Sequence, residues 1–362
     1  MKFEVLKDWR HEGYVKHKLS DILVLVMGAV ICGITELADM MVFFENKKAF
    51  FLERFGIERY PSKPTLSRVL NMLSGDKIAE AVIGIMRASI TELGDIIAVD
   101  GKSIRSTVKK GKPYSALQIL TAYCTESGVV LGQETVSDKT NEIPVLREML
   151  DNIDIKGKII TADALHCQKD TCEKILRCGG DYLLGLKGNQ QTTFDDAKLF
   201  LEDKINADEI ERYSTVEKNG GRIEERVCRK TGYVDWPLGQ SKWEGIKSFF
   251  SVNRRITTAT TTTDETNYYI CSRDVPAKEL LHITRQHWRI ESMHWMLDVV
   301  WNEDSCGLLS ENGHKTLNIF RKLALLAHKK YISTHQIKRS VKSNVLATLI
   351  NDTLLFAIIQ NL

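Results

Sequence analysis

Hydrophobic and polar residues recur with two different periods along the chain, and the change of period divides it. Over residues 19–51 apolar residues fall at helical spacing. After a break at 60–65 the helical pattern resumes at Leu66, with Pro64 at a helix start. The pattern predicts an all-helical N-terminal domain over residues 1–90. Such a domain suits DNA contact and equally suits packing or dimerisation.

From residue 95 the pattern changes to short apolar runs rich in β-branched residues. These runs predict strands at 95–100, 117–123, 129–136, 158–163 and 181–187. Helices are predicted between them at 141–150 and 167–178. The runs at 95–100 and 158–163 each end in an aspartate, Asp100 and Asp163. We expect the first part of an α/β core over 91–190, with both acids at strand ends, although an Asp-Gly step is also common in ordinary turns.

The composition shifts after residue 190. A charged helix at 194–205 is followed by Thr- and Val-rich segments at 222–228, 249–256 and 268–272, which predict a mainly β insertion over 191–273. Helical periodicity then returns at 278–300, 316–331 and 345–360. We expect the second part of the core over 274–335 and a C-terminal helical tail over 336–362.

The predicted helix at 278–300 carries an acid at the margin of its apolar stripe. The stripe consists of Ile290, Met293, Leu297 and Val300. Glu291 lies beside it and shares its side of the helix with two pairs of ring-bearing residues, which are His287, Trp288, His294 and Trp295. Core packing of the tryptophans, with Glu291 paired to Arg289 or to a distant lysine, is the alternative.

Composition and charge do not decide the class of protein. The net charge of +3 over 362 residues does not by itself indicate nucleic acid. Basic residues do cluster, at Lys102, Arg105, Lys109, Lys110 and Lys112 and again at Arg321, Lys322, Lys329 and Lys330, although a solvated face explains each cluster equally well.

Cysteine spacing and hydropathy bear on the compartment. The eight cysteines form no Cys-x-x-Cys pair, which favours reduced thiols and a cytoplasmic protein. The apolar stretch at 22–34 spans about a dozen residues, too few to cross a bilayer, so we expect a buried helix, no signal peptide and no membrane association.

Two aspartates at strand ends and a glutamate on a helix are the ligands that a two-metal phosphoryl-transfer site requires. Carboxylate oxygens suit Mg²⁺, with Mn²⁺ as a substitute, and two ions would activate the nucleophile and stabilise the leaving oxygen. Three neighbouring carboxylates repel one another without cations, so metal is expected to be obligatory. No Gly-rich phosphate loop and no Gly-x-Ser-x-Gly elbow is present.

Several motifs follow in a fixed order and carry a resemblance. They are Asp100-Gly101-Lys102 with Arg105, Asp163-Ala164-Leu165-His166-Cys167-Gln168, Gly179-Gly180-Asp181-Tyr182, Leu186-Lys187-Gly188-Asn189-Gln190, Gly221-Arg222-Ile223-Glu224, His287-Trp288-Arg289-Ile290-Glu291, His294-Trp295, and Asn318 with Arg321-Lys322. Nearly end to end, the chain resembles bacterial insertion-sequence transposases of the H-repeat-associated type, in the DDE superfamily. The resemblance implies an RNase H-like mixed sheet flanked by helices, with Asp100, Asp163 and Glu291 as the metal-binding catalytic acids.

Some positions depart from the wider pattern of related enzymes. Where Tyr, Arg and Lys often surround the glutamate, this chain has Thr284, His287 and Asp298. Where arginines are expected after Asp304, the sequence reads Ser-Cys-Gly-Leu over 305–308. The DNA contacts made by those residues are therefore not carried over.

The resemblance implies a DNA transposase that binds the terminal inverted repeats of an insertion sequence and catalyses metal-dependent strand cleavage and strand transfer. Its partner would be double-stranded DNA, held by a homodimer in the cytoplasm at the nucleoid. Candidate DNA contacts are Lys102 and Arg105 to phosphate, Lys187 and Asn189 to position the ends, and His287, Trp288, His294 and Trp295 to stack on a terminal nucleotide. The alternatives are a catalytically impaired DNA-binding remnant and a metal-dependent nuclease.

Overall fold

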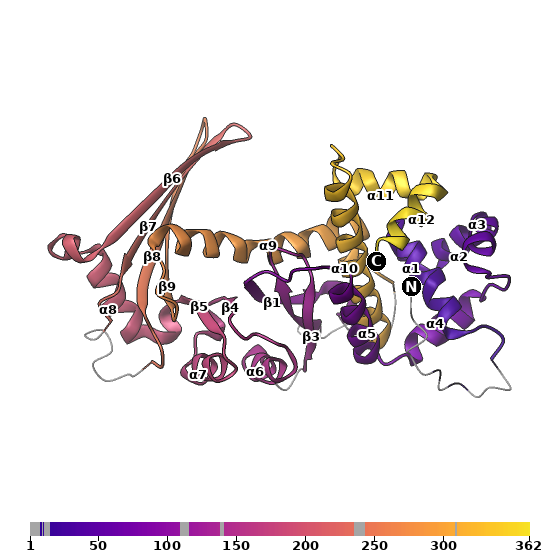
Figure 1. The fold of residues 1–362 in the computed structure, drawn as a ribbon, viewed down its shortest axis with the longest axis horizontal. Coiled ribbons are helices and arrows are strands. Elements are labelled where there is room, and N and C mark those ends of the chain that lie inside the picture. Colours follow the sequence, from indigo (N-terminus) through magenta and orange to yellow (C-terminus); the bar gives the residue numbers. More distant parts are fainter. Residues whose placement is uncertain are drawn as a thin grey trace.

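One mixed sheet runs through the molecule. The structure, a computed structural model, describes residues 8, 10, 15–108, 116–137, 141–234, 243–307 and 310–362. The basic residues Lys109, Lys110 and Lys112, and also Leu308, lie outside these ranges. In the described part, nine strands are ordered β3-β2-β1-β4-β5-β9-β8-β7-β6 and are flanked by helices (Figure 1). This arrangement confirms the predicted α/β fold.

The first five strands lie in the segment predicted as the first part of the core, 91–190. β1, β2 and β3 are antiparallel neighbours, and β4 and β5 run parallel to β1; their bounds are Ile96–Ile104, Leu117–Cys124, Val130–Val136, Ile159–Ala162 and Asp181–Leu186. The helices α6 (Glu142–Asn152) and α7 (Lys169–Arg177) connect β3 to β4 and β4 to β5. β4 is buried at every residue, as expected for a parallel strand covered on both faces. The order and directions are those of the RNase H-like sheet.

Strand β1 is longer than its apolar run suggested. The expectation that it ends at Asp100 was wrong, because pairing with β2 continues from Asp100↔Thr121 to Ile104↔Leu117. The run of apolar residues in β1 ends near the point where β1 stops pairing with β4, at Ala98↔Thr161. Beyond it, β1 has a neighbouring strand on one side only. Asp100 therefore lies within a strand that is hydrogen-bonded on one side only at that level.

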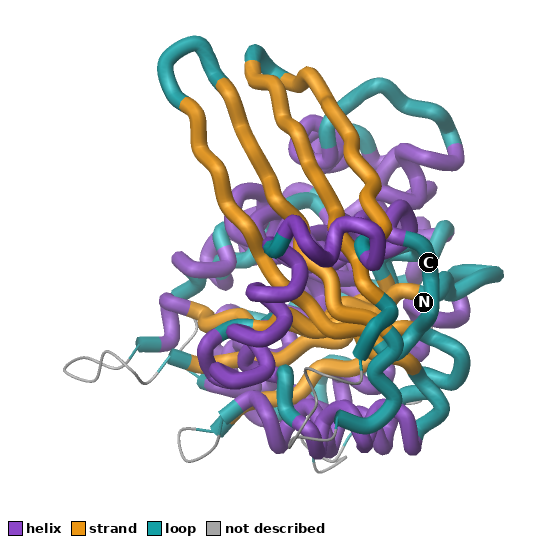
Figure 2. The backbone as a smooth tube through the Cα atoms, turned by 90° about the vertical axis from the view of Figure 1, so that its left-hand side faces the viewer, coloured by secondary structure: helices purple, strands orange, loops and turns teal. Residues whose placement is uncertain are grey.

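The predicted β segments after residue 190 extend the same sheet. β9 (Thr262–Cys271) pairs with β5, and β8 (Ser248–Thr257) and β7 (Arg222–Thr231) follow outward. The edge strand β6 (Glu211–Asn219) was missed, because few of its side chains are buried and it shows no apolar alternation. Figure 2 shows these four strands projecting together beyond the helices, and α8 (Gln191–Glu202) packs against β7, β8 and β9.

Helix α9 (Ala277–Trp301) joins the two ends of the molecule. It runs from the projecting strands, across β1, to α10 (Glu311–Thr334), as Figure 1 shows. Around α10 lie the N-terminal helices that the pattern predicted, with bounds Leu19–Ile31 (α1), Leu37–Asn46 (α2), Lys48–Phe55 (α3), Lys63–Met72 (α4) and Gly75–Ala88 (α5). Pro64 occupies the first turn of α4, as expected.

The predicted helix at 345–360 is two helices. α11 (Val341–Ile350) and α12 (Asp352–Gln360) meet at an angle of 119°. The break follows from Asn351, whose side chain accepts a hydrogen bond from the backbone N–H of Leu354 (3.0 Å) and so begins a new helix. Within the described ranges no single helix has the length and apolarity to cross a membrane, and only the bent pair α11–α12 meets that test when the two are taken together.

Two basic residues of α10, Arg321 and Lys322, are inside the molecule, whereas Lys329 and Lys330 are half-buried. Arg321 is fully buried, with a guanidinium nitrogen 3.6 Å from the carboxylate of buried Glu303. The Lys322 ammonium donates to Thr121 Oγ1 and Gln133 Oε1, both at 2.8 Å, and burial lowers its pKa to about 7. The solvated face suggested for this cluster is therefore wrong for both residues, because these charges anchor α10 to β2, β3 and the segment after α9.

The end of α9 gives a test of this packing. Trp301 is fully buried, and its Nε1 donates to Val30 O of α1 at 2.7 Å. Trp301→Ala should lower the free energy of unfolding by about 3–5 kcal/mol through the cavity and the lost hydrogen bond. Trp295→Ala, at a position 60% exposed on the same helix, should change it by less than about 0.5 kcal/mol. Chemical denaturation measures both, and equal effects would contradict the proposed packing.

Candidate active site

The pairing of β1 with β4 sets two of the predicted acids beside each other. These strands are parallel, with Ala98 opposite Thr161, so Asp100 and Asp163 come at the same level two residues later. Asp100 Oδ1 accepts a hydrogen bond from the N–H of Gly101 at 2.9 Å. Asp163 directly follows β4, and its Oδ1 accepts from the N–H of Leu165 at 3.1 Å. Backbone N–H groups thus hold both carboxylates, from within β1 for Asp100 and from the 3-10 turn Ala164–His166 for Asp163.

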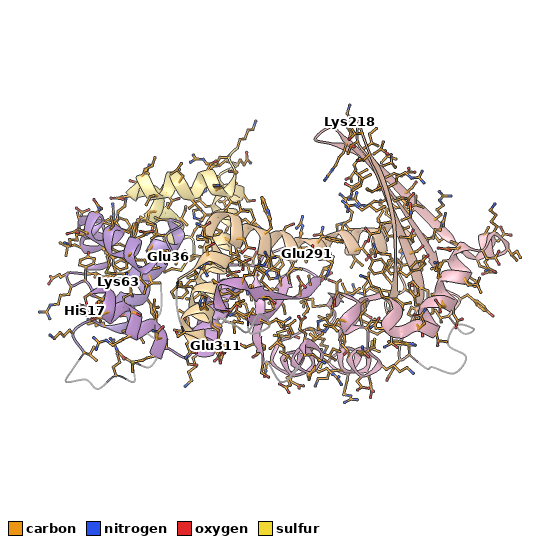
Figure 3. All side chains as sticks on the ribbon, turned by 180° about the vertical axis from the view of Figure 1, so that it is seen from behind. His17, Glu36, Lys63, Lys218, Glu291 and Glu311 are labelled. Carbon is orange, nitrogen blue, oxygen red and sulfur yellow. The ribbon has the colours of Figure 1, made fainter. Side chains whose placement is uncertain are left out.

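Glu291 reaches the same place from α9, which packs across β1 and β4. It lies partway along this helix in Figure 3. Glu291 and Asp163 line one cavity of about 180 Å³, together with His287, Trp288 and Lys187. The cavity also borders β9 through Glu265, Asn267, Tyr268 and Tyr269. Acids far apart in sequence therefore face a common space.

The electrostatics of the site show that the carboxylates repel one another. Burial, with the nearby charges of Glu291, Glu142 and Asp163, raises the pKa of Asp100 from 3.8 to about 7. Burial also raises the pKa of Glu291. A cation placed among these oxygens would relieve the repulsion and restore the charged form of Asp100.

The donor atoms fit a hard divalent ion in chemical type. Asp100, Asp163 and Glu291 offer carboxylate oxygens, which Mg²⁺ and Mn²⁺ prefer. Among the residues that the structure describes, no three His, Cys, Asp or Glu side chains are gathered closely enough to enclose one ion. The acids therefore form an open set of oxygen donors and not a closed metal cage.

The aromatic and histidine positions of α9 divide into exposed and buried ones. Trp288 and Trp295 are 52% and 60% exposed, available for stacking. His287 Nδ1 lies 3.0 Å from Thr161 Oγ1 of β4, and burial lowers its pKa. His294 is buried with Nε2 3.6 Å from Asp100 Oδ2, and burial lowers its pKa to about 3. The structure does not place His294 where it could stack on a nucleotide, and it matches the core-packing alternative.

The predicted polar DNA contacts are in different environments. Lys187 is exposed at the cavity, whereas Asn189 donates to Ala164 O at 2.6 Å and so supports the turn after Asp163. Arg105 is 84% exposed in its side chain, with Nε 3.6 Å from Asp304 Oδ2. Arg105 and Lys187 are thus the more accessible of the predicted cations near the acids.

Lys102 is held by two acids. Its ammonium contacts the carboxylate of Asp298 and lies 3.6 Å from that of Asp304. These partners outweigh the opposing effect of burial and raise the pKa of Lys102. Asp298 occupies a position where related enzymes often have a lysine. In this chain the carboxylate at that position forms an ion pair with Lys102.

Sequence reasoning did not assign a role to a fourth carboxylate, Glu142, at the start of α6. A side chain at Gly101 would collide with it, since a Cβ there would lie 2.2 Å from Glu142 Oε1. Glu142 is held by Gln118 of β2 and by buried His166, whose Nε2 is 3.3 Å away. Its only sequence signal was a helix start, because its approach to Asp100 depends on how α6 packs.

Two family models and several known proteins match the chain. The chain matches the family described as "Transposase DDE domain" over residues 92–327 and "DDE_Tnp_1-associated" over residues 1–86. It is 35% identical over 335 residues to "H repeat-associated putative transposase YhhI" of Escherichia coli K12, covering 89% of this chain and 87% of that one. "Putative transposase YncI" of Escherichia coli O157:H7 is 36% identical over 337 residues, covering 89% of this chain and 84% of that one.

One solved structure is similar at low level. The piggyBac transposase synaptic complex with hairpin DNA matches with 11% sequence identity and a TM-score of 0.46, covering 97% of this chain and 75% of that one. A similarity this low carries no argument about the site.

The raised pKa of Asp100 predicts how stability depends on pH without metal. Between pH 3.8 and about 7 the folded protein keeps a proton that the unfolded chain has released, so stability should fall as pH rises through this window. Asp100→Asn should weaken this fall and, above the window, raise the melting temperature by about 2 °C. Thermal melts in chelator across this range measure the effect, and a parallel pH profile for the variant would refute it.

Glu142→Gln should also lessen the repulsion on Asp100, because it removes one neighbouring negative charge. The pKa of Asp100 should move toward its ordinary value, which carboxylate titration by NMR measures. Glu148→Gln is the matched control, since Glu148 is an exposed residue of the same helix. An unchanged Asp100 titration in Glu142→Gln, or an equal change in Glu148→Gln, would show that Glu142 does not belong to the site.

Proposed function

Because the chain belongs to the family of transposases with a DDE domain, we propose that it binds the terminal inverted repeats of an insertion sequence and catalyses metal-dependent strand cleavage and strand transfer. The observation that supports this most directly is the pairing of β1 with β4, which sets Asp100 beside Asp163. Glu291 faces the same cavity as Asp163 from α9. These are the three acids that the sequence singled out for phosphoryl transfer.

The roles follow from the position of each carboxylate. Asp100 and Asp163 would share the ions, since the two strands hold them at one level. Glu291, on a helix, would complete one ion's ligands and orient the attacking oxygen. Mg²⁺ ions, with Mn²⁺ as substitute and two per site, would supply nucleophile activation and stabilisation of the leaving oxygen. Buried His294, with Nε2 3.6 Å from Asp100 Oδ2, lies against one side of that carboxylate.

The DNA contacts near the acids come from accessible residues. Lys187 and Trp288 line the cavity with Asp163 and Glu291, and Trp288 offers an exposed ring on which a terminal base could stack. Arg105 would contact the backbone nearby, since its side chain is 84% exposed. Lys102 is held by Asp298 and Asp304, so it would contribute less positive charge to the binding of DNA.

The reaction joins two element ends to one target, so we propose a homodimer on double-stranded DNA. The protein would act in the cytoplasm at the nucleoid. The division into a helical domain at 1–90, core segments at 91–190 and 274–335, a β insertion at 191–273 and a tail at 336–362 remains part of this proposal.

Substitution of single acids tests the reaction. Asp163→Asn should lower cleavage and strand transfer on labelled element ends with Mg²⁺ or Mn²⁺ by at least about 100-fold, because the metal site loses a charged ligand. DNA binding in chelator should be retained, which separates a loss of chemistry from a loss of folding. Asp170→Asn, on an exposed acid of α7, is the control and should leave both activities unchanged.

The outcomes distinguish the candidate functions. Cleavage without preference for element ends would assign a nuclease, and binding without cleavage by the parent protein would assign a DNA-binding remnant. Equal activity of Asp163→Asn and the parent would remove Asp163 from the site. Each assay requires the inverted repeats that flank the gene.

A further inference from the structure

Three arginines of the projecting strands surround one buried glutamate. Glu224 of β7 is 4% exposed. Its carboxylate is 2.7 Å from Arg226, contacts Arg254 of β8, and is 4.0 Å from Arg222. We call Arg222, Arg226 and Arg254 the arginine cluster. Glu224 belongs to one of the motifs recognised in the sequence, and the proposed chemistry gives it no role.

The arginine cluster lies on the face of the sheet that borders the acids. Arg226 is directly opposite Arg254, and Arg254 is directly opposite Glu265 of β9. Residues opposite each other in antiparallel strands point to the same face. Glu265 lines the cavity that also contains Asp163 and Glu291. The cluster therefore continues outward from the cavity along one surface.

Arginines outnumber carboxylates around Glu224. Arg226 and Arg254 sit in a directly opposed pair, where like charges are destabilising. A second carboxylate, Glu217 of β6, contacts Arg226 at 3.4 Å and Arg285 of α9 at 2.6 Å. Two carboxylates thus contact four guanidinium groups. Glu265, directly opposite Arg254, is a third carboxylate on this face, which leaves one positive charge among these seven residues.

The guanidinium groups are both held and accessible. The side chains of Arg222, Arg254 and Arg285 are 46%, 37% and 42% exposed. A guanidinium has five N–H donors, so one that contacts a carboxylate still has donors for a phosphate. On the opposite face, Arg255 is paired one to one with Asp264 (2.7 Å). Arg222, Arg226 and Arg254 are thus the strand arginines on the face that borders the acids.

We propose that the arginine cluster binds the phosphate backbone of duplex DNA whose end lies at the acids. This inference rests on the proposed function, which supplies the DNA. In Figure 3 the projecting strands, with Lys218 at their tip, rise beside the helix that carries Glu291. A duplex that enters the cavity would pass along this surface, and Glu224 would fix the arginines in position before DNA arrives.

Salt dependence of DNA binding tests the cluster apart from the chemistry. The full chain and Arg222→Gln/Arg254→Gln are titrated with a short fluorescent duplex in chelator at several salt concentrations. Each lost phosphate contact should reduce the slope of log affinity against log salt by about 0.9, so the double variant should lose nearly twice that and bind at least about 10-fold more weakly at low salt. Arg255→Gln, on the other face, should keep the parental slope.

Two results would overturn the proposal. One is a parental slope and affinity in the double variant, and the other is an equal loss in Arg255→Gln, which would indicate general charge attraction. Arg222→Lys/Arg254→Lys keeps the charge and should recover most of the slope, which separates phosphate contact from misfolding. A parent that binds DNA with a steep salt slope but never joins strands would remove the proposed function and leave the cluster. A parent that joins strands while the double variant binds normally would remove the cluster alone.

Discussion

The burial of Asp100 beside other carboxylates, with the repulsion that they exert on it, is the constraint around which the structure is arranged. Asp100, Asp163, Glu142 and Glu291 lie near enough for three of them to raise the pKa of Asp100, together with its burial. Main-chain hydrogen bonds of a buried sheet oppose this repulsion, because the strands cannot separate without exposing their apolar side chains. The acids are thereby kept in a state that a divalent cation would stabilise.

Positive charge is distributed so that little of it neutralises these acids directly. Lys102 is paired with Asp298 and Asp304, and Lys322 donates to uncharged oxygens inside the core. Farther out, three arginines of the projecting strands and Arg285 of α9 surround Glu217 and Glu224, with Glu265 directly opposite Arg254. Under the proposed function, this separation would leave the carboxylates free for metal and would place guanidinium groups along the approach of the DNA.

Helix α9 couples the parts of the molecule. Its first half packs against β6 and β7, Glu291 lies in its middle, and Trp301 at its end bonds to α1. A displacement of the projecting strands or of the N-terminal helices therefore acts on the helix that positions Glu291. The position of Glu291 therefore depends on the packing at both ends of α9.

The sequence by itself determined the strand of Asp100, the strand that ends just before Asp163, the helix of Glu291 and the helices between residues 19 and 88. Continuous apolar runs and helical periodicity are local signals. Tertiary structure alone decided the rest. β1 continues past Asp100 because β2 pairs with it. The exposed strand β6 is held in the sheet by its pairing with β7. Glu142 lies near the acids because α6 packs over Gly101. Such contacts depend on residues distant in sequence, so no local pattern records them.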